Sequence, residues 1–294
     1  MGNPSVLSDE GREMPWSLAC EPLNPASPAY FTIKKFNIKN FMIKDKNILN
    51  NYSAFKGWQV SQFGQCKKHW AAYYKMEIDE CRRMTENDSN NAASLQILEV
   101  GFGNGSFMGW AKSVGHQVYG LEIEEEQLAT AKASGYLVDE SLESLIKKHS
   151  LNQIDGIVAF DVFEHFSDEQ LHNHLLGFTR ILKPGGWILA RFPNGDSPFG
   201  RRNQNGDITH KLTLGSMAVR QICSNTGYAV LSIKSQRMPV VNVGIYRSVV
   251  YGLSFMVSKI LEFPIQVLLN SYYPGELKWF PLGPNLVVKI SKPK

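Results

Sequence analysis

Cysteine is scarce in this sequence, and its spacing argues against a disulfide framework or a cysteine-bound metal. The 294 residues contain four cysteines, and no two of them have the close spacing of a zinc-binding pair. They are Cys20, Cys66, Cys81 and Cys223. Such cysteines are typical of free thiols in a reducing compartment. We therefore expect no metal centre and a cytoplasmic location.

A strong excess of one charge is also missing. Lysine and arginine number 31 against 27 aspartates and glutamates, which gives a formal net charge of +4. This balance argues against a nucleic-acid partner, although a basic face for an anionic substrate or lipid remains open. The first residues carry acids and no apolar run, so we expect no secretory signal peptide. No internal repeat is evident.

An uninterrupted membrane span is the third absence. The strongly apolar stretch 240–273 is broken by Lys259, Glu262 and Pro264, which makes it a poor transmembrane segment. Its apolar residues form a stripe that is wider than one exposed helix face needs. The stripe consists of Val249, Val250, Leu253, Met256, Val257, Ile260, Leu261 and Leu268. We interpret it first as a helical cap packed on the core. A second interpretation is an interfacial helix, 245–271, that makes the protein membrane-peripheral.

The whole chain divides into three regions. Residues 1–94 are predicted to be an N-terminal extension, with short strands at 30–43 and a helix within 58–83. Residues 95–236 alternate short apolar runs with helical patterns, and 237–294 form the apolar helical cap and a closing strand. The predicted strands lie at 95–100, 117–122, 154–161, 187–192, 228–233 and 285–291. This alternation predicts an α/β fold whose parallel sheet is covered on both faces.

Local signals set several helix ends. Ser167 and Gln170 have the spacing of a capping box for a helix that continues to Leu182. The glycines of the run from Lys183 to Gly186 are predicted to stop that helix before the next strand. Ser216 is a candidate cap for a helix that ends at Gly227.

A glycine-rich loop lies between the first predicted strand of the 95–236 region and its helix. Its key residues are Glu99, Gly101, Gly103 and Gly105. Glycines let backbone N–H groups approach a ligand at a helix N-terminus. The dinucleotide fingerprint would need glycine where Ser106 stands, which argues against a nicotinamide cofactor. A tight turn without a ligand remains the alternative for such a loop taken alone.

Glu122, at the end of the second strand of this region, is placed to accept hydrogen bonds from both hydroxyls of a ribose. The segments EVGFGNG, YGLEIEEEQL, DGIVAFDVFEHF and ILKPGGWILARFPN then resemble, in order and spacing, the motifs of class I S-adenosylmethionine-dependent methyltransferases. The resemblance runs from about residue 95 to 233. It implies a doubly wound Rossmann-like domain with a mostly parallel seven-stranded sheet, and S-adenosyl-L-methionine as the cofactor.

The resemblance also implies roles for single residues. Glu99 and the three loop glycines would surround the methionine end of the cofactor, and Glu122 would hold its ribose. The remaining implied cofactor contacts are Asp139, Ser141 and Asp161. The segment 138–141 departs from the family's common Gly-Asp form, so the adenine contacts of Asp139 and Ser141 rest on position alone.

A narrower resemblance concerns the acceptor. PNGDSPFGRRNQNGDITH, at 193–210, resembles the methyltransferases of bacterial polysaccharide and lipopolysaccharide biosynthesis. It implies a small-molecule or glycan substrate. Paired Arg201 and Arg202 suit a phosphate or carboxylate on that substrate, although a solvated basic turn is the more common case for two adjacent arginines.

Removal of a proton from a hydroxyl acceptor needs a base, and histidine suits that task near neutral pH. His210 is our first candidate for the base or a substrate ligand, with Asp207 near enough to orient it; a loop-stabilising hydrogen bond is the alternative. His165 is the second candidate, or a residue that shapes the cofactor pocket. A quinone precursor or natural product as acceptor, and a catalytically silent cofactor-fold binding protein, remain open alternatives.

Overall fold

The structure is a computed structural model that describes residues 56–85, 93–273 and 280–294. The chain separates into two units, 1–39 and 40–294, and the first unit lies wholly outside the described residues. The strands predicted at 30–43 lie outside them as well.

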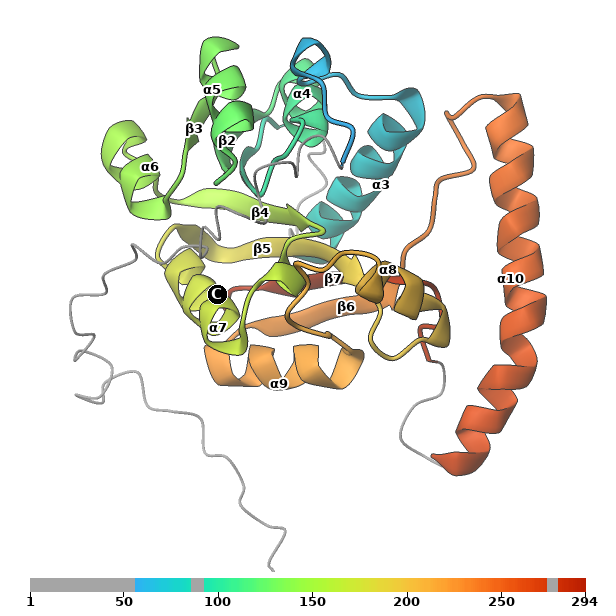
Figure 1. Ribbon diagram of the computed structural model, residues 1–294. Helices are drawn as coiled ribbons and strands as arrows, with labels where there is room; N and C mark the ends of the chain where they lie inside the picture. The colour runs from blue at the N-terminus through green and yellow to red at the C-terminus, as the bar shows by residue number, and fades with distance from the viewer. Residues whose placement is uncertain (1–55, 86–92, 274–279) are drawn as a thin grey trace, which may run out of the picture. The chain divides into compact units, whose positions relative to one another are not determined.

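A single sheet forms the centre of the second unit (Figure 1). Its strands are β1 (Gln96–Val100), β2 (Gln117–Leu121), β3 (Leu137–Asp139), β4 (Ile154–Phe160), β5 (Leu182–Pro193), β6 (Ala229–Ser235) and β7 (Asn285–Ser291). They lie side by side in the order β3-β2-β1-β4-β5-β7-β6. Neighbours from β3 to β5 are parallel, and β7 runs antiparallel to both β5 and β6. The predicted seven-stranded, mostly parallel sheet is confirmed.

Helices cover both faces of this sheet, as a parallel sheet requires (Figure 1). On one face lie α3 (Lys68–Thr85), α4 (Ser106–Ser113) and α5 (Glu125–Ala133). On the other lie α6 (Leu142–His149), α7 (Asp168–Thr179) and α9 (Ser216–Thr226). Short elements complete the described chain: η3 (Val60–Gln62), η4 (Phe163–His165), η5 (Pro198–Gly200) and α8 (Arg201–Asn205). The doubly wound arrangement is therefore confirmed.

The predicted capping box is present at the start of α7. The Ser167 hydroxyl accepts from the Gln170 amide, and the Gln170 side chain accepts from the Ser167 amide. The predicted stop at Lys183 to Gly186 is wrong in part, because α7 already ends at Thr179 and β5 includes these residues. The pairing of β4 with β5 shifts register between Ile154 and Gly156, and this irregularity accommodates the two glycines.

Other local predictions also need correction. Gly215, not Ser216, is the N-cap of α9, and the Asp196 carboxylate accepts the Ser216 N–H at 2.6 Å in place of a local cap. The predicted end at Gly227 is confirmed, with φ of +77° in the left-handed region. Neither β3 nor α6 was predicted, since a strand of three residues carries too little periodicity to recognise.

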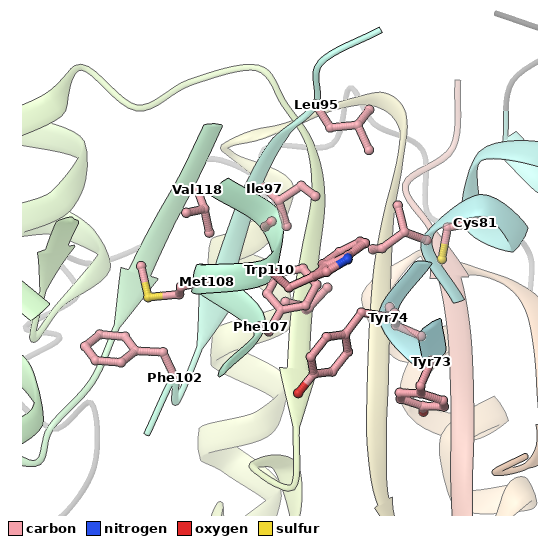
Figure 2. Close-up of a cluster of buried hydrophobic side chains, with 14 of the residues drawn as sticks. Tyr73, Tyr74, Cys81, Leu95, Ile97, Phe102, Phe107, Met108, Trp110 and Val118 are labelled. Atoms are coloured by element: carbon pink, nitrogen blue, oxygen red, sulfur yellow. The ribbon is translucent and has the colours of Figure 1, made fainter. Parts of the chain in front are cut away.

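Helix α3 is part of the main hydrophobic core. Figure 2 shows Tyr73 and Tyr74 of α3 beside Phe107 and Trp110 of α4. The rings of Tyr74 and Phe107 meet edge to face with centroids 5.2 Å apart. Aromatic pairs of this geometry add to the free energy of burial. The helix that precedes the sheet is thereby fixed over β1, β4 and β5.

A buried cluster of charges links α3 to the closing strand. Lys289 of β7 is fully buried, and its ammonium lies 2.5 Å from Glu77 and 2.8 Å from Glu80. Burial is the largest single influence and lowers the pKa of this ammonium, but Glu77, Cys81 and Glu80 together outweigh burial and raise the pKa overall. Lys234 of β6 joins the same two carboxylates. The pairing fixes α3 against the antiparallel half of the sheet.

The last helix, α10 (Ile245–Tyr272), does not pack as predicted. All eight residues of the apolar stripe listed above are exposed, so the interpretation as a cap whose stripe packs on the core is wrong. The physical reason is that the opposite face, with buried Glu262 and Gln266, turns inward. Gln266 exchanges two hydrogen bonds with the backbone of Phe280, at 2.6 and 3.0 Å. Among the described residues, α10 is the one helix whose length and composition would allow it to cross a membrane.

The buried cluster yields a stability prediction. Lys289→Ala should lower the free energy of unfolding by about 3–5 kcal/mol, because the buried Glu77 carboxylate loses its nearer partner and keeps only Lys234, at 3.6 Å. Lys75→Ala is the matched control, since it removes the exposed Lys75–Asp79 pair of the same helix and should cost less than about 1 kcal/mol. Urea denaturation measures both. Equal losses would show that the buried cluster does not hold α3 to β7.

Candidate functional site

A cavity of about 330 Å³ opens at the carboxyl ends of β1, β4 and β5. In doubly wound sheets, ligands bind at this edge. The glycine loop forms one wall, and Phe160, Asp161 and Arg191 form another. Trp58 and Trp70 close it from the segment that precedes β1. No local pattern singles out these two tryptophans, because only the folded chain brings them to the loop.

The backbone of the loop needs its glycines. Gly101, Gly103 and Gly105 have φ of +66°, +50° and +70°, a region that side chains other than glycine rarely enter. A Cβ on Gly101 would lie 2.7 Å from a methyl of Val162, and one on Gly103 would lie 2.7 Å from the Trp58 ring. Side chains therefore cover the loop so closely that only glycine fits at these positions, and the predicted cofactor contacts of the three glycines stay a prediction.

Glu99 is the most unusual charged group of the cavity. Its side chain is buried at the end of β1, and one carboxylate oxygen has no hydrogen-bond partner. Burial, followed by the charge of Glu122, raises its pKa well above the ordinary value of 4.5. A buried carboxylate with an unsatisfied oxygen favours a cationic or N–H-bearing ligand.

Glu122 binds the loop itself. Its carboxylate accepts from the amides of Gly103 at 2.8 Å, Ile123 at 2.8 Å and Glu124 at 3.1 Å. Burial still raises its pKa. Each oxygen retains capacity for a further donor. The predicted contact with a ribose therefore stays a prediction, and the structure adds a role in holding the glycine turn.

Asp161 closes β4 in the left-handed region, with φ of +59°. The Arg191 guanidinium donates to it from Nε at 3.0 Å and also from Nη2. The same guanidinium lies over the rings of Trp70 and Phe160, 5.2 and 5.3 Å from their centroids. A non-glycine residue held at positive φ is uncommon and often marks a functional site. Arg191 was not predicted, because it belongs to an apolar strand whose sequence is typical of a buried core strand.

The two predicted adenine contacts have structural partners. Asp139, at the end of β3, pairs with Lys148 at 2.5 Å and accepts the Glu140 amide. Although burial opposes it, the Lys148 bond lowers the pKa of Asp139. Ser141 is the N-cap of α6, and its hydroxyl accepts the Ser144 amide. Both lie at the sheet edge as expected, and their contact with a cofactor stays a prediction.

A second cluster lies beyond β4 and consists of Glu164, His165 and His210. The rings of His165 and His210 meet edge to face with centroids 4.7 Å apart. His210 Nε2 lies 3.9 Å from Glu164 Oε1, and neither carboxylate oxygen of Glu164 has a hydrogen-bond partner. The three side chains offer ligand atoms within 4.8 Å of one another, which could hold a metal ion. Glu164 was not predicted, since its position beside His165 says nothing of its burial.

The two histidines are oriented by different partners. His165 Nδ1 lies 2.9 Å from the Thr209 hydroxyl, and burial, followed by the neighbouring His210, lowers the pKa of His165 to about 4. His210 Nδ1 lies 2.8 Å from the Gln204 carbonyl oxygen. That contact assigns the proton to Nδ1 and the lone pair to Nε2.

The Asp207 carboxylate accepts from the Thr209 hydroxyl and pairs with Lys56 at 2.9 Å, and the Asp207 carbonyl oxygen accepts the His210 backbone N–H at 3.3 Å. Although burial opposes them, Thr209 and Lys56 lower the pKa of Asp207. Asp207 thereby fixes the turn that carries both Thr209, the partner of His165, and His210 itself. Arg201 and Arg202 lie exposed in the first turn of α8, open to either interpretation.

The comparisons with known proteins agree with this fold. Residues 98–190 match a family model described as a methyltransferase domain. The chain is 30% identical over 105 residues to an uncharacterized methyltransferase of Bacillus cytotoxicus, which covers 35% of this chain and 49% of that protein. It is 28% identical over 120 residues to a ubiquinone biosynthesis O-methyltransferase of Thiobacillus denitrificans, with 38% and 50% covered. The chain spans about half the length of these relatives.

Two solved structures share the fold. One is a SAM-dependent methyltransferase from Archaeoglobus fulgidus, with a TM-score of 0.50, 19% identity, and 74% of this chain and 92% of that chain covered. The other is a putative methyltransferase in complex with the Haloferax volcanii Trm112 activator, with a TM-score of 0.50, 14% identity, and 84% and 97% covered. These two likenesses show the fold, and the match to the methyltransferase-domain model covers residues 98–190 within it.

The crevice fits S-adenosyl-L-methionine as the cofactor. The unsatisfied Glu99 carboxylate is suited to the ammonium of a methionine moiety. Arg191 and Lys67, which also line the cavity, are suited to its carboxylate. The glycine loop supplies a wall that a Cβ would obstruct.

Glu99 yields a prediction about pH. Because its pKa is raised in the folded protein, the native state holds a proton that the unfolded chain releases, and stability falls as pH rises above 4.5. Glu99→Gln should therefore be more stable than the parent at pH 8, with little difference at pH 4. It should also weaken S-adenosylhomocysteine binding about tenfold or more, because an ionic hydrogen bond is lost.

Urea denaturation at the two pH values and calorimetric titration check this prediction. Glu140→Gln, at an exposed position near the same sheet edge, should change neither quantity. A Glu99→Gln variant that loses stability at pH 8, or binds as tightly as the parent, contradicts the role assigned to Glu99.

The glycine loop yields a second prediction. Gly103→Val should weaken S-adenosylhomocysteine binding about 100-fold or more, because the new side chain meets Trp58 and blocks the crevice. Gly115→Val is the matched control: Gly115 also has positive φ, +87°, but open space around it. Both variants carry left-handed strain, and calorimetry should find binding lost only in the first. If Gly103→Val still binds S-adenosylhomocysteine with micromolar affinity, the cofactor does not bind at this loop.

Proposed function

We propose that this chain transfers a methyl group from S-adenosylmethionine to a hydroxyl of a small molecule or glycan, and that the acceptor is a sugar of a surface polysaccharide. The observation that carries the proposal is the pairing of two sites at one sheet edge. A crevice with an unsatisfied buried carboxylate suits the cofactor, and a histidine cluster follows on η4 and the loop after α8.

The first task of the chain is to hold the cofactor. Glu99 binds the methionine ammonium, and Arg191, itself fixed by Asp161 and Trp70, binds the carboxylate. Trp58 and Trp70 exclude water from the crevice, which strengthens these ionic contacts. The bound cofactor supplies a methyl group activated by its sulfonium.

The second task is to remove the acceptor proton. His210 Nε2 takes the hydroxyl proton, while the Gln204 carbonyl keeps Nδ1 protonated and the ring in place. The resulting imidazolium lies near the buried Glu164 carboxyl, which stabilises the added charge. His165, held neutral by its low pKa, packs against the His210 ring and orients it.

Two observations support a charged glycan acceptor. The 193–210 segment resembles methyltransferases of polysaccharide biosynthesis, and η5, α8 and the following loop, which it forms, lie beside the histidine cluster. Arg201 and Arg202 are exposed on this segment and suit a phosphate on a nucleotide-sugar or lipid-linked glycan.

A second candidate acceptor is a quinone precursor. It is favoured by the relative named as a ubiquinone biosynthesis O-methyltransferase, which matches 38% of this chain. A methyl-transfer assay with nucleotide-sugars, lipid-linked glycans and catechol-type precursors separates the two. Cofactor binding without transfer to any of these would favour a third candidate, a silent binding protein on the same fold.

The role of the histidine yields a prediction. His210→Ala should lower kcat about 100-fold or more without a change in cofactor affinity, because it removes the base and leaves the crevice intact. An unchanged kcat would show that His210 is not the base. Dialysis of the parent against EDTA separates a base from a metal ligand: activity kept after dialysis supports the base, and activity lost supports a metal held by Glu164, His165 and His210.

A further inference from the structure

Helix α10 is amphipathic in the reverse of the usual sense. A surface helix normally buries its apolar stripe and exposes polar residues. In α10 the inward face carries buried Glu262 and Gln266, and Lys259 pairs with Glu262 on the same side. Arg237, which precedes the helix, covers the inward ring of Phe255 at 4.7 Å. The inward face therefore carries the polar groups of α10 and contacts the rest of the unit through Gln266 and Phe255.

The outward face is apolar along the whole helix. One row follows the i, i+4, i+7 spacing and is exposed at every position: Val249, Leu253, Met256, Ile260, Phe263 and Val267. A second row, which includes Val250, Val257 and Leu261, lies beside it and is also exposed. At 100° per residue, the two rows span about 160° of the helix surface. No charged residue interrupts them.

The width of this face favours a lipid surface over a second copy of the chain. A helix–helix seam uses one row of residues every 3.5 positions, so the first row alone would suffice for it. The second row would stay in water in such a pair. A bilayer surface covers a wide arc at once. Tyr246 and Tyr272, both exposed at the helix ends, are amphipathic side chains that suit the lipid headgroup region.

The connections of α10 determine how it can meet a membrane. It is inserted between β6 and β7, where Ser235 and Leu286 are paired neighbours in the sheet. A helix that crossed a bilayer would deliver its end to the side opposite β7. The twelve residues 273–284 would then have to cross back, whereas a helical crossing needs about 20. A single crossing is therefore incompatible with the sheet, although the length and composition of α10 alone would allow it.

We propose that α10 lies in the plane of a phospholipid bilayer, with its outward rows inserted among the lipids and its polar face on the protein. The helix is about 42 Å long from its 28 residues, which gives the contact a large apolar area. Exposed Arg247 in the first turn and the net charge of +4 favour an anionic surface. The site needs neither cofactor nor acceptor, so it stands apart from the proposed methyl transfer.

Vesicle sedimentation of the full chain, without cofactor, tests the proposal. The parent should sediment with vesicles of phosphatidylglycerol and phosphatidylcholine. The triple variant Leu253→Glu, Met256→Glu, Ile260→Glu should bind the vesicles at least about tenfold more weakly, because it places three charges on the inserted face. The matched control replaces three exposed apolar residues away from α10, Val114→Glu, Leu176→Glu and Met217→Glu, and should sediment like the parent.

Two further measurements keep the outcomes separate. S-adenosylhomocysteine titration and circular dichroism should be equal in the parent and both variants, which shows that each variant is folded. Light scattering after size exclusion should find the same mass for the parent and the α10 variant. A parent that stays in the supernatant with anionic and neutral vesicles overturns the proposal. So does a dimer that only the α10 variant loses, since that result assigns the face to a second copy.

Discussion

The burial of Glu99 beside a glycine-only turn is the constraint on which the rest of the site depends. A parallel sheet covered on both faces brings the end of β1 deep under α3 and α4, so a carboxylate placed there is cut off from water. Burial raises the pKa of this carboxyl, so Glu99 keeps a proton in the free protein. A ligand with a positive group would favour the ionised carboxylate, as expected for a cofactor that carries an amino acid ammonium.

The surrounding structure keeps this crevice in shape. Glu122 holds the glycine turn from one side by accepting the Gly103 amide, and Asp161 holds Arg191 from the other. The Lys289–Glu77 contact fixes α3, whose Trp70 covers the guanidinium. The polar groups that line the crevice are therefore held by contacts from the ends of β2 and β4 and from β5 and β7, which are distant in sequence.

Sequence predicted those parts whose signals are local. Strand–glycine–helix succession located the crevice, and the Ser167–Gln170 spacing located a helix start, because both depend on residues a few positions apart. Arg191, Glu164 and Trp58 escaped prediction, since their importance comes from burial and contacts across the sheet. The stripe of α10 was recognised as apolar, but periodicity says only which residues share a face. Which face turns inward was decided by Glu262 and Gln266, whose polar contacts hold the opposite side.

Two features of this chain call for a ligand: a crevice at the carboxyl edge of the sheet, and an apolar helix inserted between the last two strands. The most direct test of the central claim is a crystal structure with S-adenosylhomocysteine. The account predicts the amino group of the ligand at the unpartnered oxygen of Glu99 and its backbone along Gly101 and Gly103. A ligand bound elsewhere, with Trp58 still packed on an empty glycine turn, would contradict it.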